Sequence, residues 1–198
     1  MGTLKRKKQI KEKLKLGFTC IKMKIGAIDF NKEIGLLKSI RKEFSKSEIE
    51  LRVDANGAFT PKNALEKFAQ LAKLQLHSIE QPIKQGQLEE MAILCEKTPL
   101  PIALDEELIG VFSSEKKQKV IETIKPQYII LKPSLVGGFA GSLEWINLAN
   151  QNNTIRESLS RKYESHGIGP SSLPIERQST NLNNDYSSPN IMDRTVPV

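Results

Sequence analysis

The sequence contains few cysteines and no long apolar run. Its two cysteines, Cys20 and Cys95, share no CxxC spacing, so neither a disulfide framework nor a structural zinc site is expected. No apolar run approaches the roughly 18–20 residues that a membrane-spanning helix needs. The charged N-terminus is also not followed by the apolar segment of a secretory signal. These absences predict a cytoplasmic protein with reduced thiols and no membrane partner.

Basic residues outnumber acidic ones by 30 to 23, which gives a formal net charge of +7. Such an excess favours a nucleic acid or another anionic surface as partner. However, residues 1–15 contain seven basic and one acidic side chain, whereas residues 16–150 contain 18 and 17. No aromatic residues are interleaved with the N-terminal lysines to stack on bases. We therefore interpret the excess as one basic surface helix and expect no nucleic-acid partner.

Helical and strand patterns alternate along residues 4–149. Because 38% of the residues are hydrophobic, the chain can bury a core. The expected helices span residues 4–16, 30–44, 60–74, 87–96, 116–124 and 141–149, and the expected strands span residues 20–25, 50–54, 77–80, 101–105 and 128–132. Strands that alternate with helices at this spacing predict parallel βα units. Five such strands are fewer than the eight of a closed parallel barrel.

The composition changes after residue 150. Residues 151–198 contain 12 hydrophobic residues among 48, eight serines and six asparagines, but no Ala, Phe or Trp. This composition is typical of a loop or a disordered tail. We therefore divide the chain into a βα domain over residues 1–150 and a tail over residues 151–198.

A charged residue lies near the carboxyl end of every expected strand. The five residues are spaced 30, 26, 25 and 27 positions apart, and they are Lys24, Asp54, Glu80, Asp105 and Lys132. The carboxyl ends of parallel barrel strands converge on one face, where buried charges are costly unless they are paired or bound to metal. The pattern predicts a site in which three carboxylates suit a hard divalent cation such as Mg²⁺. For any single acid, helix capping or a surface ion pair is the alternative.

The lysines complete this pattern. Lys22 and Lys24 point to the same face of their strand. A partly desolvated lysine beside a second cation has a lowered pKa and can act as a base; solvated lysines on a half-exposed strand are the alternative. Lys132 ends an apolar strand and needs anionic partners. Two lysines that face each other across a metal-held carboxylate substrate are suited to removing the proton α to that carboxylate.

Five short motifs resemble one known family. Lys-Met-Lys, Val-Asp-Ala-Asn, Ile-Glu-Gln-Pro, Leu-Asp-Glu-Glu and Leu-Lys-Pro-Ser are similar to the enolase superfamily, in the branch of muconate-lactonizing enzymes and o-succinylbenzoate synthases. The resemblance covers about residues 4–149. It implies an incomplete TIM-type (β/α) barrel without the N-terminal capping domain. The family's last two strands would follow Ala149, and a reading-frame shift after Asn153 is one hypothesis for the tail.

The resemblance also implies a reaction and its residues. The family uses a Lys or His base with Mg²⁺, with Mn²⁺ as a second candidate ion here. The reaction implied is syn dehydration of 2-succinyl-6-hydroxy-2,4-cyclohexadiene-1-carboxylate to 2-succinylbenzoate, a step of menaquinone synthesis. The implied roles are metal ligation by Asp54, Glu80 and Asp105; acid and base chemistry by Lys24; enediolate stabilisation by Lys132; substrate binding by Lys22, Gly137 and Gly138; and ligand orientation by Asn56 and Glu106.

Two alternatives to this dehydratase stay open at this point. N-acylamino acid racemases and dipeptide epimerases of the same superfamily use the same lysines and acids. A non-catalytic remnant of the barrel is the other alternative, because an open sheet exposes two edges. The sequence indicates a small carboxylate substrate but no oligomeric state.

Overall fold

Parallel strands and covering helices alternate through residues 3–151, as expected. The computed structural model describes residues 3–152 and 195–197. The strands are β1 (Cys20–Lys24), β2 (Glu50–Asp54), β3 (Ile79–Glu80), β4 (Ile102–Leu104), β5 (Tyr128–Ile129) and β6 (Thr195–Pro197). The helices are α1 (Thr3–Lys15), α2 (Phe30–Glu43), α3 (Pro61–Ala72), α4 (Leu88–Lys97), the short 3-10 helix η1 (Glu106–Leu108), α5 (Ser114–Ile124), α6 (Pro133–Val136) and α7 (Gly138–Gln151).

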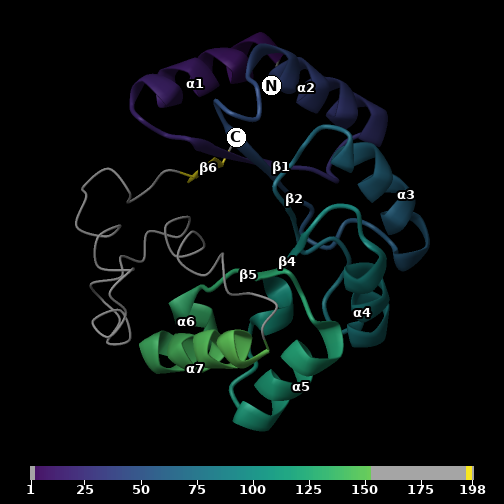
Figure 1. The fold of residues 1–198 in the computed structure, drawn as a ribbon, viewed down its shortest axis with the longest axis vertical. Helices are drawn as coiled ribbons and strands as arrows, with labels where there is room; N and C mark the ends of the chain where they lie inside the picture. Colours follow the sequence, from purple (N-terminus) through teal and green to yellow (C-terminus); the bar gives the residue numbers. More distant parts are fainter. Residues whose placement is uncertain (1–2, 153–194, 198) are drawn as a thin grey trace.

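The sheet runs in the order β5-β4-β3-β2-β1-β6, and each neighbouring pair is parallel. The first five strands therefore lie side by side in chain order, without the reversal that defines a doubly wound sheet. Figure 1 shows the sheet curving, with the helices along its outer side. This is the arrangement of a (β/α) barrel wall, and it places the carboxyl ends of all five strands at one rim.

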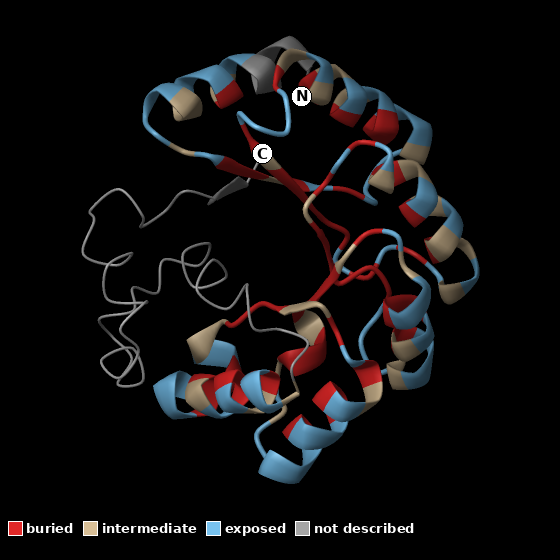
Figure 2. Ribbon diagram, viewed as in Figure 1, coloured by how far each residue is buried: buried red, intermediate tan, exposed pale blue. Residues whose placement is uncertain are grey.

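The core lies between the outer face of the sheet and the helices (Figure 2). Leu51, Val53 and Ile79 are fully buried on the strands. Helix α3 buries Phe68 against them, and Thr60 and Asn63 fix its start, where the Thr60 backbone N–H donates to Asn63 Oδ1 at 3.0 Å. Alternate residues of each strand thus face the helices, which leaves the charged residues of β1 and β2 on the inner face.

Two parts of the fold differ from the sequence prediction. The last expected strand ends at Ile129 instead of residue 132, and α6 and an earlier start of α7 occupy the loop predicted before residue 141. Gly137, with φ of 98°, ends α6. Second, β6 pairs with β1 where only a tail was expected. Residues 153–194, which the frame-shift and disorder hypotheses concern, lie outside the described residues.

Cys20 and Cys95 are both buried thiols, and burial raises the pKa of Cys95 to about 12. Within residues 3–152 and 195–197, every helix is too short or too polar to span a membrane.

Candidate active site

Three carboxylates lie next to each other at the carboxyl rim of the sheet. Asp54 ends β2, Glu80 ends β3 and Asp105 follows β4. Asp54 and Glu80 are register partners across β2 and β3. Their exposed fractions are 2%, 3% and 1%, so all three acids are withdrawn from water. The structure thus places at one rim the three residues that the sequence predicts as metal ligands.

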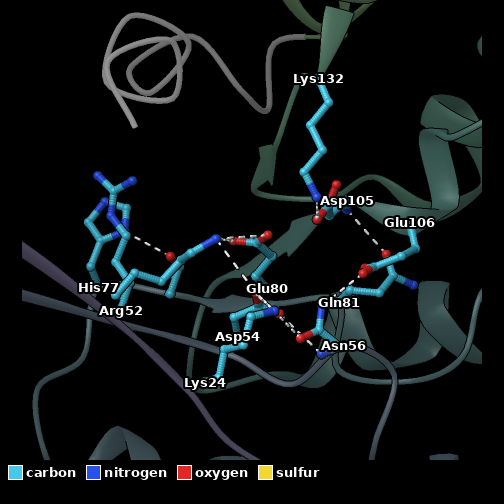
Figure 3. A network of polar contacts seen from close by, with 12 residues as sticks. Lys24, Arg52, Asp54, Asn56, His77, Glu80, Gln81, Asp105, Glu106 and Lys132 are labelled. Carbon is cyan, nitrogen blue, oxygen red and sulfur yellow. Dashed lines mark hydrogen bonds and ion pairs between the residues drawn. The ribbon is translucent and has the colours of Figure 1, made fainter. Parts of the chain in front are cut away.

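Three lysines contact these carboxylates. Lys22 Nζ lies 3.0 Å from Glu80 Oε2 and 3.5 Å from Asp54 Oδ2. Lys24 Nζ lies 3.2 Å from Asp54 Oδ2, and Lys132 Nζ donates to Asp105 Oδ2. Figure 3 shows Lys24 and Lys132 on opposite sides of the carboxylates. A ligand bound at the carboxylates would therefore have a lysine on each side.

Burial and charge act on these groups in opposite directions. Burial lowers the pKa of Lys22, but the neighbouring Glu80, Asp54 and Asp105 outweigh it and raise this pKa above its ordinary value. Lys22 is therefore a permanent cation suited to holding a carboxylate. Burial, followed by the adjacent Glu80, raises the pKa of Asp105 to about 7, although Lys132 opposes this shift. Burial and Glu80 thus outweigh the opposing effect of Lys132 on this pKa.

Asn56 links Lys24, the candidate base, to the loop that follows β4. Lys24 Nζ donates to Asn56 Oδ1, and Asn56 Nδ2 donates to Glu106 Oε1 at 2.8 Å. The Asn56 backbone N–H also donates to Asp54 Oδ1 at 3.1 Å. Both predicted orienting residues, Asn56 and Glu106, therefore belong to the contact network of the rim.

Gln81 has a role that the sequence analysis did not assign. This side chain is fully buried, and its Oε1 accepts the backbone N–H groups of Asp105 and Glu107, both at 3.2 Å. Its Nε2 donates to the carbonyl of Ile83 at 3.0 Å. Gln81 therefore ties the loop after Glu80 to the loop that carries Asp105. The only sequence signal was its place in the Ile-Glu-Gln-Pro motif.

Gly137 and Gly138 lie one short helix beyond Lys132, where they join α6 to α7. A Cβ on Gly137 would lie 3.6 Å from Phe112 Cδ1, so this turn packs against the loop after η1. Their predicted role in substrate binding stays a prediction. His77, two residues before β3, is half-buried and stacks on Tyr128 with ring centroids 4.7 Å apart.

The carboxylate oxygens at the rim are the type of ligand that Mg²⁺ prefers, but they are not arranged around one common point. Among the described residues, no three His, Cys, Asp or Glu side chains are grouped closely enough to hold a metal ion. Lys22 contacts both Asp54 and Glu80. However, Asp105 Oδ1 is buried and has no hydrogen-bond partner among the described residues, which is costly unless a cation approaches it. Three buried carboxylates with one such oxygen fit Mg²⁺.

Comparisons with known proteins agree with this arrangement. An o-succinylbenzoate synthase from Desulfotalea psychrophila is 56% identical over 143 residues, which are 72% of this chain and 39% of that protein. The crystal structure of MenC from Desulfotalea psychrophila LSv54 superposes with a TM-score of 0.73 and 52% identity, over 77% of this chain and 42% of that one. The chain thus spans about two fifths of the length of these relatives.

A racemase from Streptomyces coelicolor A3(2), solved with bound magnesium, is a more distant match. Its TM-score is 0.70 at 25% identity, over 78% of this chain and 42% of that one. Residues 5–155 match the family described as enolase C-terminal domain-like, which confirms the expected superfamily and its barrel fold. Because that match spans more than half of the sequence, the chain belongs to the enolase C-terminal domain-like family.

Proposed function

We propose that the chain carries the proton-transfer site of a dehydratase of the o-succinylbenzoate synthase type. The observation that supports this most strongly is the placement of Lys24 and Lys132 on opposite sides of three buried carboxylates (Figure 3). The 56% identity to an o-succinylbenzoate synthase supports the same reaction. The substrate is then 2-succinyl-6-hydroxy-2,4-cyclohexadiene-1-carboxylate, whose dehydration is a step of menaquinone synthesis.

Lys24 acts first as a base and then as an acid. Its unprotonated Nζ removes the proton on the carbon that bears the substrate carboxylate, and the electron pair of that C–H bond is delocalised onto this carboxylate before it enters the ring. The ammonium formed then protonates the hydroxyl group that leaves from the neighbouring carbon, so that water is released and the ring becomes aromatic. A positioned acid or base contributes about 10²–10⁴-fold to the rate. The side chain of Lys24 is 61% exposed, which leaves it accessible to a substrate.

Lys132 and Lys22 supply fixed positive charge. Negative charge moves from the α-carbon to the substrate carboxylate as the proton leaves, and a preorganised cation nearby stabilises that charge. Lys132 approaches from the side opposite Lys24, whereas Lys22 lies among the carboxylates and helps to hold the substrate carboxylate. Gly137 and Gly138 would form the part of the substrate-binding surface that lies beyond Lys132.

Asp54, Glu80 and Asp105 would hold the divalent ion, Mg²⁺ or Mn²⁺. When bound, this ion draws electron density from the substrate carboxylate and so makes the α-proton more acidic. Asn56 and Glu106 orient Asp54 and Lys24 through the hydrogen bonds described above. Such neighbours of metal ligands control both geometry and affinity.

The proposal is tested by incubating the purified full chain with the cyclohexadiene substrate and Mg²⁺, and by measuring 2-succinylbenzoate by chromatography. We expect product with the wild-type chain and none with Lys24→Ala. A folded, Mg²⁺-binding chain without turnover would overturn the dehydratase assignment and favour a non-catalytic protein.

Racemisation of an N-acylamino acid, or epimerisation of a dipeptide, is the second candidate function. The match to a magnesium-bound racemase supports it, because two lysines on opposite sides of one α-carbon can each remove or return its proton. Deuterium exchange at the α-carbon of an N-succinylamino acid in D₂O separates the two functions. Exchange of this substrate without turnover of the cyclohexadiene would favour the racemase.

We also propose a small carboxylate as the partner of this site and the cytoplasm as its location. The two buried thiols support a reducing compartment. The inward contacts of Lys22 and Lys132 with carboxylates leave neither lysine to bind a polyanion.

A further inference from the structure

Two cations lie side by side on the inner face of the sheet. Lys22 on β1 and Arg52 on β2 are register partners in parallel strands. Neighbouring strands are about 4.8 Å apart, and residues two positions apart share a face. Arg52 therefore faces the same interior as Asp54. Like charges in such a cross-strand pair destabilise a sheet, so the two side chains need separate counter-ions.

The contacts divide the two cations between opposite ends of the strands. Lys22 reaches toward the carboxyl rim and contacts Glu80 and Asp54. Arg52, which is 5% exposed, turns the other way. Its Nε and one Nη both contact Oε1 of Glu50, at the start of β2. Figure 3 shows the Arg52 side chain beside His77 and away from Asp105.

Glu50 is itself held in place by its neighbours. Cys20 Sγ donates to Glu50 Oε1 at 3.6 Å. His77 Nε2 lies 3.9 Å from Glu50 Oε2, and the His77 ring is stacked on Tyr128. The carboxylate that receives Arg52 is thus fixed at the amino end of the barrel interior.

We propose that Glu50 is a positioning residue that holds the Arg52 guanidinium away from the metal-binding carboxylates. Arg52 and Asp54 are two residues apart in one strand, about 6.6 Å, which an arginine side chain can span. Guanidinium groups form strong two-point contacts with carboxylates. Without Glu50, Arg52 turns toward Asp54 and Glu80 and competes there with a divalent cation. The inference rests on the proposed Mg²⁺ site.

The test measures Mg²⁺ affinity of the full chain by isothermal titration calorimetry, with no turnover involved. Glu50→Asp keeps the charge but shortens the side chain by one methylene group, and Glu50→Gln keeps the length but removes the charge. Both variants are expected to bind Mg²⁺ about tenfold more weakly, as substitutions behind metal ligands commonly do. The exposed Glu66 on α3 gives a matched control, Glu66→Gln, with unchanged affinity.

A second substitution separates positioning from simple loss of charge. In an Arg52→Met background, Glu50→Asp and Glu50→Gln are expected to change the affinity by less than about twofold, because no guanidinium remains to compete. An equal loss in both backgrounds would overturn the inference, as would wild-type affinity in Glu50→Asp. A folded wild-type chain that binds no Mg²⁺ would instead overturn the proposed function. Circular dichroism melting curves of each variant separate lost folding from lost affinity.

Discussion

Lys22 and Lys24 reach the same oxygen from one face of β1. Their Nζ atoms lie 3.5 and 3.2 Å from Asp54 Oδ2, yet the Lys22 side chain is 15% exposed and that of Lys24 is 61% exposed. Lys22 is therefore a buried cation with two carboxylate partners, whereas Lys24 is open to a ligand. This difference supports the proposed roles, substrate binding for Lys22 and base for Lys24, within three residues of one strand.

Substitution of Lys24 should abolish proton transfer while leaving the fold intact. We expect Lys24→Ala to slow deuterium exchange at the substrate α-carbon by about 10²–10⁴-fold, because the positioned base is lost. NMR spectroscopy in D₂O measures this exchange. Lys38, exposed on α2, provides the control Lys38→Ala. Wild-type exchange in Lys24→Ala would assign the base to another residue.

Substitution of Lys22 should instead weaken substrate binding. This cation contacts Glu80 and Asp54, and Lys22→Met removes the charge that we propose holds the substrate carboxylate. We expect KM to rise by about tenfold or more, since a charged hydrogen bond contributes roughly 1.5–3 kcal/mol. Steady-state kinetics at saturating Mg²⁺ separate KM from kcat. A loss confined to kcat would contradict the binding role.

Divalent metal should stabilise the folded chain through the carboxylate rim. At 100 times its Kd, Mg²⁺ should increase the free energy of unfolding by about 2.7 kcal/mol. Asp54→Asn, Glu80→Gln and Asp105→Asn should each remove most of this gain, whereas Glu66→Gln should retain it. Urea unfolding with and without Mg²⁺ measures the difference. An equal gain in Asp105→Asn would place the metal elsewhere.

The raised pKa of Asp105 predicts how stability depends on pH. Folding raises this pKa from 3.8 to about 7. A carboxyl group of raised pKa favours the folded state below pH 3.8, and this contribution is lost as the pH rises to about 7. Without added metal, the Tm should therefore fall across this window.

Mg²⁺ should reverse this trend, because metal binding requires the ionised carboxylate. The rise in Tm on adding Mg²⁺ should thus be larger near pH 8 than near pH 5. Thermal melts across this range, with Asp105→Asn as the comparison, measure the effect. The prediction fails if the Mg²⁺-dependent rise is the same at both pH values.

Gly141, on α7, has no room for a larger side chain, so we expect its substitution to destabilise the fold. A Cβ at this position would overlap the carbonyl oxygen of Val136. Gly141→Ala should therefore destabilise the fold by about 1–3 kcal/mol, as overpacking does. A Cβ on Gly35, in the middle of α2, would have no neighbour within 4 Å in the part of the chain that the structure describes. Gly35→Ala should therefore stabilise the fold by roughly 0.5–1 kcal/mol. Urea unfolding of the two variants tests this contrast.

Much of the fold could be predicted because the spacing of apolar residues indicates which face of each helix or strand is buried. The alternation of Cys20 to Lys24 places both lysines on one face, and Thr60 with Pro61 marks the start of α3. The short helix α6 could not be predicted, since four residues after Lys132 carry too little periodicity. The strand β6 was missed for the same reason, because three residues in a polar region carry no strand pattern.

The sequence by itself determined which charged groups reach the rim, since parallel strands of regular spacing bring Asp54, Glu80 and Asp105 to one edge. Only the tertiary structure decided how those groups are paired. Each of these pairings involves residues on different strands or loops. Examples are the contact of Lys132 with Asp105, the opposite directions of the Arg52 and Lys22 side chains, and the buried hydrogen bonds of Gln81. Burial and neighbouring charge set the pKa and exposure of each group, and both arise only when distant segments pack together.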